Sequence, residues 1–573
     1  MALDRNTTYD SSEEIGLCFS DLNLTKFLDY IQGNESEYSL LLGDVDQIHT
    51  YVFETSKLPE IRGASQLLDA LIRNDFNEIF NNCSTDADSG EIDKNKDRGY
   101  ILYNNAGSCM AIVPTGRVEE FTRSVKEKFL RETGAVTITF AHSPFWGPSE
   151  GDHPALQDHS VSGGEVSKWL LESNTGIPNQ QMRLLRFLQY QLSIEKKKKS
   201  SFPFLESNPI VRRCSHCGKR PAVHEWKYEN ETYFICSVCN RKRLKGDKSE
   251  ILTELVKRKK SYADYMEKTP PDLDNLVGNS GYIGILYVDG NEMGKMLYGA
   301  QDLKEFKARS QEIESSILES LDSVLERFKN HRGEYLPFEI LNRAGDDILM
   351  ILQSEYVLEF SLDLLSEFEA TCSKKLKKDI TVSLGATIFR AKYPVQYAFE
   401  LAKSLLKSAK RFSKQTAHEP CSAISYLYMK TPIAATSCEE ILHSYYTAFN
   451  EVYLTMRPYT RDEFGLLLSL AREISQILTN SQVTSISRSF EEKSPNSAMN
   501  FVKYQIARMG DPEREPLLRM IEKLRAKFNL KDLDGTEELP LWGKRIINGR
   551  EAIATPFLDI FEISEIMGGD LLE

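Results

Sequence analysis

Two apolar stretches that end in acidic residues constrain what this chain can fold into. The first stretch, Gly281–Leu297, is rich in Ile, Tyr and Val up to Asp289. The second, FEILNRAGDDILMIL, places Asp346 and Asp347 between two apolar runs. Each run predicts a buried strand. Since Gly345 can take the positive φ of a two-residue hairpin turn, we expect both aspartates at a hairpin tip, where three carboxylates can converge.

Three converging carboxylates indicate a site for divalent cations. Mg²⁺, or Mn²⁺ in its place, takes one or two carboxylates from a protein and fills its other positions with water and phosphate oxygens. Two such ions can activate an attacking hydroxyl group and stabilise a leaving pyrophosphate. Gly290 and Gly345 lack a Cβ, so a triphosphate could approach the backbone there. Alternatively, Asp-Gly and Gly-Asp-Asp are ordinary turns, which is the commoner meaning of either motif alone.

Composition and charge narrow the class of protein. The chain has 573 residues, 41% of them hydrophobic, which is enough for about three to five domains. No window approaches a membrane span and the start is polar and acidic, so we expect a cytoplasmic protein without a signal peptide or membrane contact. The net charge is −13, yet residues 196–260 carry 18 Lys and Arg against 7 Asp and Glu. This basic segment is either a solvated face or a surface for nucleic acid or an acidic partner.

The sequence contains an internal repeat. Residues 104–109 (NNAGSC) match residues 342–347 (NRAGDD) at three of six positions, with apolar runs on both sides. Asp44 and Asp289 both follow the opening strand of their unit. Each unit therefore predicts a β-α-β-β-α-β order, the split βαβ or ferredoxin-like arrangement.

The two copies are expected to differ in function. The match places Ser108 and Cys109 where the second copy has its paired aspartates, and neither is a good Mg²⁺ ligand. We therefore expect the first copy to be catalytically degenerate. Its opening strand is predicted over residues 39–43, with a helix that begins near Gly63-Ala64-Ser65.

Four cysteines between the repeat units have the spacing of a metal site. Cys214 and Cys217 form one CxxC pair and Cys236 and Cys239 a second, with 18 residues between the pairs. This spacing is typical of a four-sulfur tetrahedral Zn²⁺ site. Because such a site keeps no open position, the zinc is expected to stabilise a small module and to perform no chemistry.

The whole chain is therefore predicted to be an α+β multidomain protein. A polar surface loop is expected over Cys83–Gly99, and helical periodicity dominates the last part of the sequence. The predicted domains are an N-terminal arm (residues 1–37), a first repeat unit (38–200), a zinc module (201–265), a second repeat unit (266–435) and a C-terminal helical bundle (436–573).

These motifs resemble a known family over nearly the whole chain. The sequences GDVDQIHTYVF, KLPEIRGASQLLD, YVDGNEMG, AGDD and LLKSAK, with the double CxxC, are similar to the CRISPR-associated protein ten family. That family is the large, polymerase-like subunit of type III CRISPR RNA-guided effector complexes. The resemblance implies two palm domains, guide RNA, target RNA and other complex subunits as partners, and conversion of ATP into cyclic oligoadenylates at the second palm when target RNA binds.

The resemblance also assigns roles to residues. It implies metal ligation by the three aspartates, phosphate contact at Gly290, Asn291 and Gly345, and a counter-charge to the triphosphate at Lys410. We further expect Gly63, Ala64 and Ser65 to contact an acceptor ATP, unless they only begin a packed helix. Two departures stand out: Ala344 replaces the family's first turn glycine, and the sequence has no His-Asp dipeptide, so no HD nuclease is expected.

Two other functions are compatible with these residues. The protein could be a catalytically silent scaffold that holds RNA and partner subunits. It could also keep the active site and join AMP to another small molecule. The three retained aspartates favour an enzyme, although the first copy shows that the fold survives without the pair.

Overall fold

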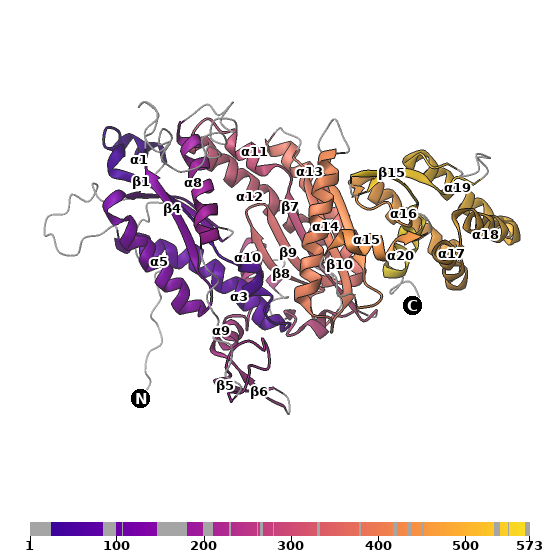
Figure 1. The fold of residues 1–573 in the computed structure, drawn as a ribbon, viewed down its shortest axis with the longest axis horizontal. Helices are drawn as coiled ribbons and strands as arrows, with labels where there is room; N and C mark the ends of the chain where they lie inside the picture. The colour runs from indigo at the N-terminus through magenta and orange to yellow at the C-terminus, as the bar shows by residue number, and fades with distance from the viewer. Residues whose placement is uncertain are drawn as a thin grey trace, which may run out of the picture. The chain divides into compact units, whose positions relative to one another are not determined.

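A computed structural model of the chain contains two compact units (Figure 1). The first comprises Met1–Ile48, Leu68–Phe204 and Lys295–Arg309, and the second comprises His49–Leu67, Leu205–Gly294 and Ser310–Glu573. The structure describes residues 24–83, 99–105, 107–145, 180–198, 210–228, 231–259, 262–263, 268–278, 280–328, 333–376, 380–415, 421–432, 437–448, 452–531, 539–547 and 549–567. Most of the predicted N-terminal arm and of the loop over Cys83–Gly99 lies outside the described residues.

The first unit is built on a four-stranded antiparallel sheet with the order β2-β3-β1-β4. Its central strand β1 is longer than the predicted residues 39–43 and is almost completely buried. Leu40, Met110 and Ile112 form its core with Leu185 and Leu188 of α8. The strands are β1 (Tyr38–Val45), β2 (Tyr100–Asn105), β3 (Ser108–Pro114) and β4 (Ile138–Pro144), and the helices are α1 (Leu24–Tyr30), η2 (Glu35–Glu37), η3 (Leu71–Asp75), α4 (Phe76–Cys83), η4 (Thr115–Arg117), α5 (Val118–Thr133) and α8 (Gln180–Lys198).

The second unit is built on a six-stranded sheet with the order β14-β11-β10-β7-β9-β8. Among the described strands of this sheet, the β10–β11 pair is parallel and the other pairs are antiparallel. The strands are β7 (Tyr282–Gly290), β8 (Phe338–Ala344), β9 (Asp347–Gln353), β10 (Val382–Arg390), β11 (Ala423–Tyr428) and β14 (Tyr459–Thr460). The central strands β7 and β10 are buried along almost their whole length because helices cover both faces of the sheet.

Glycines show which helix covers which face. Gly284 of β7 lies against Val357 of α13 (Ser354–Leu376), and Gly385 of β10 lies against the backbone of α14 (Val395–Gln415). Gly385 pairs with Tyr287, three residues along β7 from Gly284, so the two helices lie on opposite faces. Asp289 has the same parity as Tyr287 and therefore lies on the α14 face.

A small module containing the four cysteines also belongs to the second unit (Figure 1). It contains the hairpin β5 (His224–Tyr228) and β6 (Glu231–Ile235), followed by α9 (Ser237–Lys245) and α10 (Glu250–Arg258). The second unit also contains two short 3₁₀ helices, η6 (Leu273–Leu276) and η7 (Glu326–Phe328). Four helices have residues in both units: α2 (Ile48–Val52), α3 (Leu58–Ala70), α11 (Met293–Tyr298) and α12 (Leu303–Leu325).

The C-terminal part is helical but adds a sheet that the sequence analysis did not predict. The helices are α15 (Cys438–Tyr445), α16 (Arg461–Ile477), α17 (Asn480–Glu492), α18 (Pro495–Arg508), α19 (Asp511–Phe528) and α20 (Phe557–Met567). The sheet β12-β13-β16-β15 is formed by Thr447–Ala448, Val452–Tyr453, Arg550–Ala554 and Gly543–Ile547. Strands of two to five residues are too short for a clear alternating pattern. Among the described residues, no helix is both long and apolar enough to cross a membrane.

The internal repeat is present, but its register differs by one residue from the sequence match. In the first sheet Asn105 pairs with Ser108 across the hairpin, and in the second Ala344 pairs with Asp347. In both sheets the outer strand bulges at a leucine three residues before this pair. The shared bulge and the shared closing pair fix the correspondence of the two hairpins independently of residue identity.

This register corrects one prediction. Gly107 corresponds to Asp346 and Ser108 to Asp347, so Cys109 does not replace an aspartate. Cys109 corresponds to an apolar strand residue instead and is only 1% exposed in the core of the first sheet. A shift of one residue moves a side chain to the other face of a strand, which explains this burial. The first copy still lacks the paired carboxylates, because glycine and serine stand in their places.

Candidate metal and nucleotide site

The structure brings the three predicted aspartates together. Asp289 lies near the end of β7, and Asp346 and Asp347 lie at the tip of the β8–β9 hairpin. The turn consists of Gly345, with φ of 63°, and Asp346, as the hairpin pattern predicts. One carboxylate oxygen from each aspartate lies within 4.8 Å of the others. We call these three carboxylates the acidic cluster.

The acidic cluster is electrostatically unfavourable without a cation. Burial, followed by the charge of Asp289, raises the pKa of Asp346 to about 7. The same two causes raise the pKa of Asp347 well above its usual range. A divalent cation would replace this repulsion by attraction, and three carboxylates are the hard oxygen donors that Mg²⁺ or Mn²⁺ prefers. The residues present therefore fit the predicted metal.

Lys410 of α14 places a positive charge beside the acidic cluster. Its Nζ forms an ion pair with the carboxylate of Asp289 and donates a hydrogen bond to the carbonyl oxygen of Gly290 at 3.1 Å. Gly290 lies close to Asp346, because a Cβ at this position would be 3.1 Å from Asp346 Oδ2 and would clash with Met293. Any larger residue would therefore disturb the cluster.

Asn291 is placed beside the site, but its side chain is engaged in the protein itself. Its Nδ2 donates to Thr381 Oγ1 at 3.0 Å and to Ser413 Oγ at 3.2 Å, and its Oδ1 accepts from Ser383 Oγ at 2.8 Å. Its backbone N–H donates to the carbonyl of Thr381 at 2.8 Å. Asn291 therefore ties the end of β7 to β10 and α14, and the expectation of a direct phosphate contact from its side chain does not fit this network.

Gly63, Ala64 and Ser65 lie inside α3, which begins at Leu58 and not near Gly63 as predicted. Gly63 packs against the backbone of α9 around Lys242, where a Cβ would clash. Ala64 is fully buried, and Ser65 donates a hydrogen bond to the carbonyl oxygen of Leu341. These contacts favour the packed-helix interpretation over contact with an acceptor nucleotide.

The early motif GDVDQIHTYVF contributes an aromatic cluster that the sequence analysis did not foresee. The rings of His49 and Phe53 lie 4.7 and 4.4 Å from that of Phe399 of α14, measured between centroids. The ring of Tyr287 lies 5.6 Å from Phe399, so the cluster covers the face of β7 on which Asp289 lies. Burial, followed by the charge of Lys403, lowers the pKa of His49 to about 4, which keeps this ring neutral.

The first copy preserves the lysine contact although it lacks the acidic pair. Lys196 of α8 forms an ion pair with Asp44 and donates to the carbonyl oxygen of the following residue at 3.3 Å. Lys410 makes the same two contacts with Asp289 and the residue after it. The sequence did not reveal this correspondence, because Lys196 is the first of four consecutive lysines and such a run is typical of a solvated helix end.

Other details of the repeat agree with this correspondence. Asp46 accepts hydrogen bonds from Thr137 Oγ1 at 2.6 Å and Thr139 Oγ1 at 2.7 Å, as Asn291 is bonded to Thr381 and Ser383 in the second copy. The next residues, Gln47 and Glu292, both have positive φ, 52° and 55°. The two strand ends thus have one local architecture with different polar groups.

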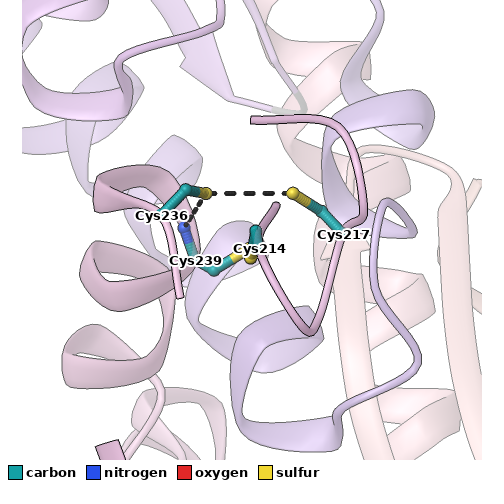
Figure 2. Close-up of side chains that lie close together, drawn as sticks. All are labelled: Cys214, Cys217, Cys236 and Cys239. Carbon is teal, nitrogen blue, oxygen red and sulfur yellow. Dashed lines mark hydrogen bonds between the residues drawn. The ribbon is translucent and has the colours of Figure 1, made fainter. Parts of the chain in front are cut away.

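The four predicted zinc ligands converge as well (Figure 2). Their Sγ atoms all lie within 4.8 Å of one another, and those of Cys217 and Cys236 are 3.8 Å apart. Tetrahedral Zn²⁺ with bonds of about 2.3 Å would separate its sulfurs by about 3.8 Å. Cys236 also caps α9, since its Sγ accepts a hydrogen bond from the backbone N–H of Cys239 at 3.4 Å. The arrangement fits a closed, structural Zn²⁺ site.

A mostly antiparallel sheet with clustered carboxylates at a central strand end and a neighbouring hairpin tip defines the second sheet as a palm-type domain. Residues 282–417 match the family described as Cas10/Cmr2, second palm domain. The match confirms the resemblance predicted from the sequence for this segment and includes all three aspartates and Lys410.

The chain is also similar, at low identity, to solved Csm1–Csm4 cassettes. The cassette in complex with cA3 has a TM-score of 0.48 and 13% identity over 93% of this chain and 70% of that chain. The cassette in complex with AMPPNP has a TM-score of 0.46 and 12% identity over 89% of this chain and 67% of that chain. The cassette in complex with cA4 has a TM-score of 0.40 and 13% identity over 66% of this chain. This match spans only about half, 53%, of that chain's length. No curated protein matches the sequence.

Proposed function

We propose that this chain is the large subunit of a cytoplasmic type III CRISPR RNA-guided complex and that its second palm is a nucleotidyltransferase activated by target RNA. The reaction joins ATP molecules into a signalling nucleotide of the cyclic oligoadenylate type. The observation that carries the proposal is the acidic cluster with Lys410, because both lie in the segment that matches the Cas10/Cmr2 second palm family.

The residues of the cluster divide the chemistry. Asp289, Asp346 and Asp347 would hold two Mg²⁺ or Mn²⁺ ions, which supply Lewis acidity for the attacking hydroxyl and the leaving pyrophosphate. Lys410 would exchange Asp289 for the triphosphate of the donor ATP. The acceptor's 3′-hydroxyl would attack the donor α-phosphorus and release its proton to solvent, a phosphodiester bond would form, and pyrophosphate would leave with the electrons of the broken P–O bond.

Two features keep the site in shape for this reaction. Gly345 allows the tight turn at the hairpin tip, so a phosphate could approach the backbone there. Asn291 holds the end of β7 through its hydrogen bonds to Thr381 and Ser383, which positions Asp289. Within the wider proposal, the two sheets are ferredoxin-like palms with a structural zinc module between them in sequence, and guide RNA and other subunits complete the complex.

One experiment tests the proposal against its alternatives. The complex, assembled with guide RNA, is incubated with ATP, Mg²⁺ and matching or non-matching target RNA, and the products are identified by mass spectrometry. Cyclic adenylates formed only with matching RNA are expected. No product under any condition would favour the scaffold, whereas AMP joined to another supplied small molecule would change the acceptor.

A pair of matched variants locates the activity. Asp346→Ala with Asp347→Ala removes the hairpin carboxylates and should abolish synthesis while assembly and RNA binding persist. The control Ser108→Ala changes the corresponding hairpin of the first copy and should retain synthesis. A folded double variant that makes product at the wild-type rate would exclude the proposed active site.

A further inference from the structure

The hairpin that carries Asp346 and Asp347 has one of its strands, β8, at the edge of the second sheet. Among the described strands of this sheet, β8 is paired only with β9. The ladder between them is also interrupted, because the pairing passes from Ile340 to Asn342 and leaves Leu341 unpaired in a bulge. An edge strand with a bulge is held by one irregular ladder, so contacts with other elements decide how firmly its tip is placed.

Arg62 of α3 makes the first of these contacts. Its guanidinium group forms a bidentate ion pair with Glu339 of β8, with N···O distances of 2.9 and 2.7 Å, and both residues are only 3% exposed. The same group donates to the carbonyl oxygens of Gly246, at the end of α9, at 3.0 Å and of Pro270 at 2.7 Å. Four hydrogen bonds from one planar group leave Arg62 little freedom, so it fixes the start of β8 relative to α9.

Ser65, three residues after Arg62, makes the second contact. Its hydroxyl donates to the carbonyl oxygen of Leu341, the residue that the bulge leaves unpaired. Residues three apart lie on the same side of a helix, so Arg62 and Ser65 bind β8 side by side. A third contact lies closer to the tip, where Arg343 forms an ion pair with Glu254 of α10. The helices α3 and α10 therefore hold β8 at three points that approach the tip.

The module that contains the four cysteines, called the cysteine module below, holds α3 in turn. Gly63 has no room for a side chain because the backbone at Lys242 and Gly246 lies against it. His216, inside the first CxxC pair, is hydrogen-bonded through Nδ1 to the carboxylate of Glu60, and both side chains are almost completely buried. Thus α3 connects the cysteine module to β8, and all the residues involved belong to the second unit.

Metal ligands tolerate little displacement. Ligand distances in a metal site lie within about 0.2 Å of their ideal values, and a misplacement of about 1 Å can cost about 100-fold in rate. Asp346 and Asp347 follow the end of β8, whereas Asp289 lies on β7. A shift of β8 would therefore move two of the three carboxylates relative to the third. The contacts of α3 with β8 act on the acidic cluster in this indirect way.

We propose that Arg62 is a positioning residue for the acidic cluster. Through Glu339 it holds β8, and with it the two hairpin carboxylates, in the place where they bind divalent cations together with Asp289. Ser65 supports the same strand at its bulge. The cysteine module therefore sets the affinity of the acidic cluster for Mg²⁺ or Mn²⁺. This inference rests on the metal site of the proposed function and adds its control by the module.

Arg545 provides a matched control at the opposite edge of the same sheet, beside β14. Its guanidinium group forms a bidentate ion pair with Glu463 at 2.9 and 3.0 Å and also donates to the carbonyl oxygens of Met456 and Pro458. This is the bonding pattern of Arg62, one carboxylate and two carbonyl groups. Lysine keeps the charge and loses the planar fork, so Arg62→Lys and Arg545→Lys remove comparable bonds, of which only the first lie at β8.

Binding of Mn²⁺ to the full chain, followed by electron paramagnetic resonance without ATP, separates positioning from general stability. The sites of the acidic cluster are those lost in Asp346→Ala with Asp347→Ala. At temperatures where both lysine variants remain folded, we expect Arg62→Lys to weaken Mn²⁺ binding at these sites at least about fivefold. Arg545→Lys should change it by less than about twofold, because distant sites act independently.

Ser65→Ala tests the same inference with a milder change, and it remains available if Arg62→Lys does not fold. It removes one hydroxyl group and no charge, and it should weaken Mn²⁺ binding about threefold through loss of the bond to β8. The control Ser366→Ala removes a half-buried hydroxyl that donates to the carbonyl oxygen of Leu362 within α13 at 2.9 Å, and it should leave the Mn²⁺ affinity unchanged. Melting temperature and zinc content show that each variant is intact.

A second measurement tests the part of the cysteine module. Because coupling between two binding sites is reciprocal, cations at the acidic cluster must strengthen zinc binding by the factor by which zinc strengthens theirs. Competition with a chelator that binds Zn²⁺ and not Mg²⁺ should therefore show a zinc affinity at least about fivefold higher at saturating Mg²⁺. This gain should be absent in Asp346→Ala with Asp347→Ala and smaller in Arg62→Lys.

The possible failures are distinguishable. Equal Mn²⁺ affinity in Arg62→Lys and Arg545→Lys, or in Ser65→Ala and the wild type, would show that these contacts only stabilise the fold. A zinc affinity that does not respond to Mg²⁺ would likewise overturn the inference. If the double alanine variant bound Mn²⁺ as the wild type does, the metal site of the proposed function would itself be contradicted, and the inference with it.

Discussion

Replacing Asp346 by asparagine should stabilise the metal-free protein at neutral pH. In the folded chain, burial and the charge of Asp289 raise the pKa of Asp346 from 3.8 to about 7. A raised carboxyl pKa means that folding favours the protonated form. Below the pKa that Asp346 has in the unfolded chain, the carboxyl is protonated in both states and does not lower the free energy of unfolding. As pH rises from about 4 to 7, the ionised carboxyl destabilises the folded state increasingly. Asparagine keeps the shape of the side chain and has no charge to desolvate.

The size of the effect follows from the pKa. Each pKa unit is worth about 1.4 kcal/mol, so the ionised carboxyl costs the metal-free fold at most about 4 kcal/mol at pH 7.5 and about 1 kcal/mol at pH 4.5. Asp346→Asn should therefore raise the melting temperature by a few degrees at pH 7.5 and by much less at pH 4.5. Added Mg²⁺ should reverse the order, because only the wild type gains the full binding energy of the cation.

The assay is differential scanning calorimetry in metal-depleted buffer, without a chelator, so that the tightly held zinc remains. Asp511→Asn is the control, since Asp511 lies in the first turn of α19 with its side chain 79% exposed. It should change stability by no more than about 0.5 kcal/mol, and in the unfavourable direction. A lower melting temperature for Asp346→Asn at pH 7.5 without Mg²⁺, or the same gain at both pH values, would refute the electrostatic reasoning.

Three further outcomes can be checked on single variants. Cys214→Ser should release Zn²⁺, measured by atomic absorption, and lower the yield of folded protein, because a structural zinc contributes on the order of 10 kcal/mol to folding in isolated zinc peptides; a wild type without zinc would contradict this. Lys410→Ala should reduce the synthesis rate at least tenfold and weaken ATP binding, whereas Lys196→Ala should alter synthesis far less; equal effects would remove the assigned role of Lys410. Ala64→Trp should lower the melting temperature by overpacking the core around α3, and an unchanged melting temperature with weakened ATP binding would restore the acceptor-site hypothesis.

Sequence predicts well those parts of the site in which residues close in the chain determine one another's positions. A hairpin tip fixes Asp346 and Asp347 relative to each other, and each CxxC pair places two thiols on one turn. An apolar strand that ends at Asp289 also reveals where its carboxylate must lie. These elements could be predicted because local backbone rules determine them.

The parts that sequence predicts poorly depend on contacts between distant segments. Gly63 resembles a glycine that leaves room for a ligand. A side chain is excluded there for another reason, because the backbone at the end of α9 packs against α3 at Gly63. Asn291 resembles a ligand-binding amide, yet partners some 90 and 120 residues away occupy its hydrogen-bonding groups. The register of the repeat was misplaced because chance identity at Asn and Ala-Gly outweighed a bulge that only strand pairing reveals.

The corrected register changes what the repeat says about function. Both copies keep an aspartate at the end of the first strand and a lysine bonded to it, so this pair does not distinguish an active copy from a degenerate one. The copies differ at the hairpin tip, where Gly107 and Ser108 stand opposite Asp346 and Asp347. In both copies the lysine neutralises a partly buried carboxylate, so its presence alone does not indicate catalysis. The difference between the copies in their capacity for two divalent cations therefore lies in the hairpin, and the hairpin is where substitutions discriminate between enzyme and scaffold.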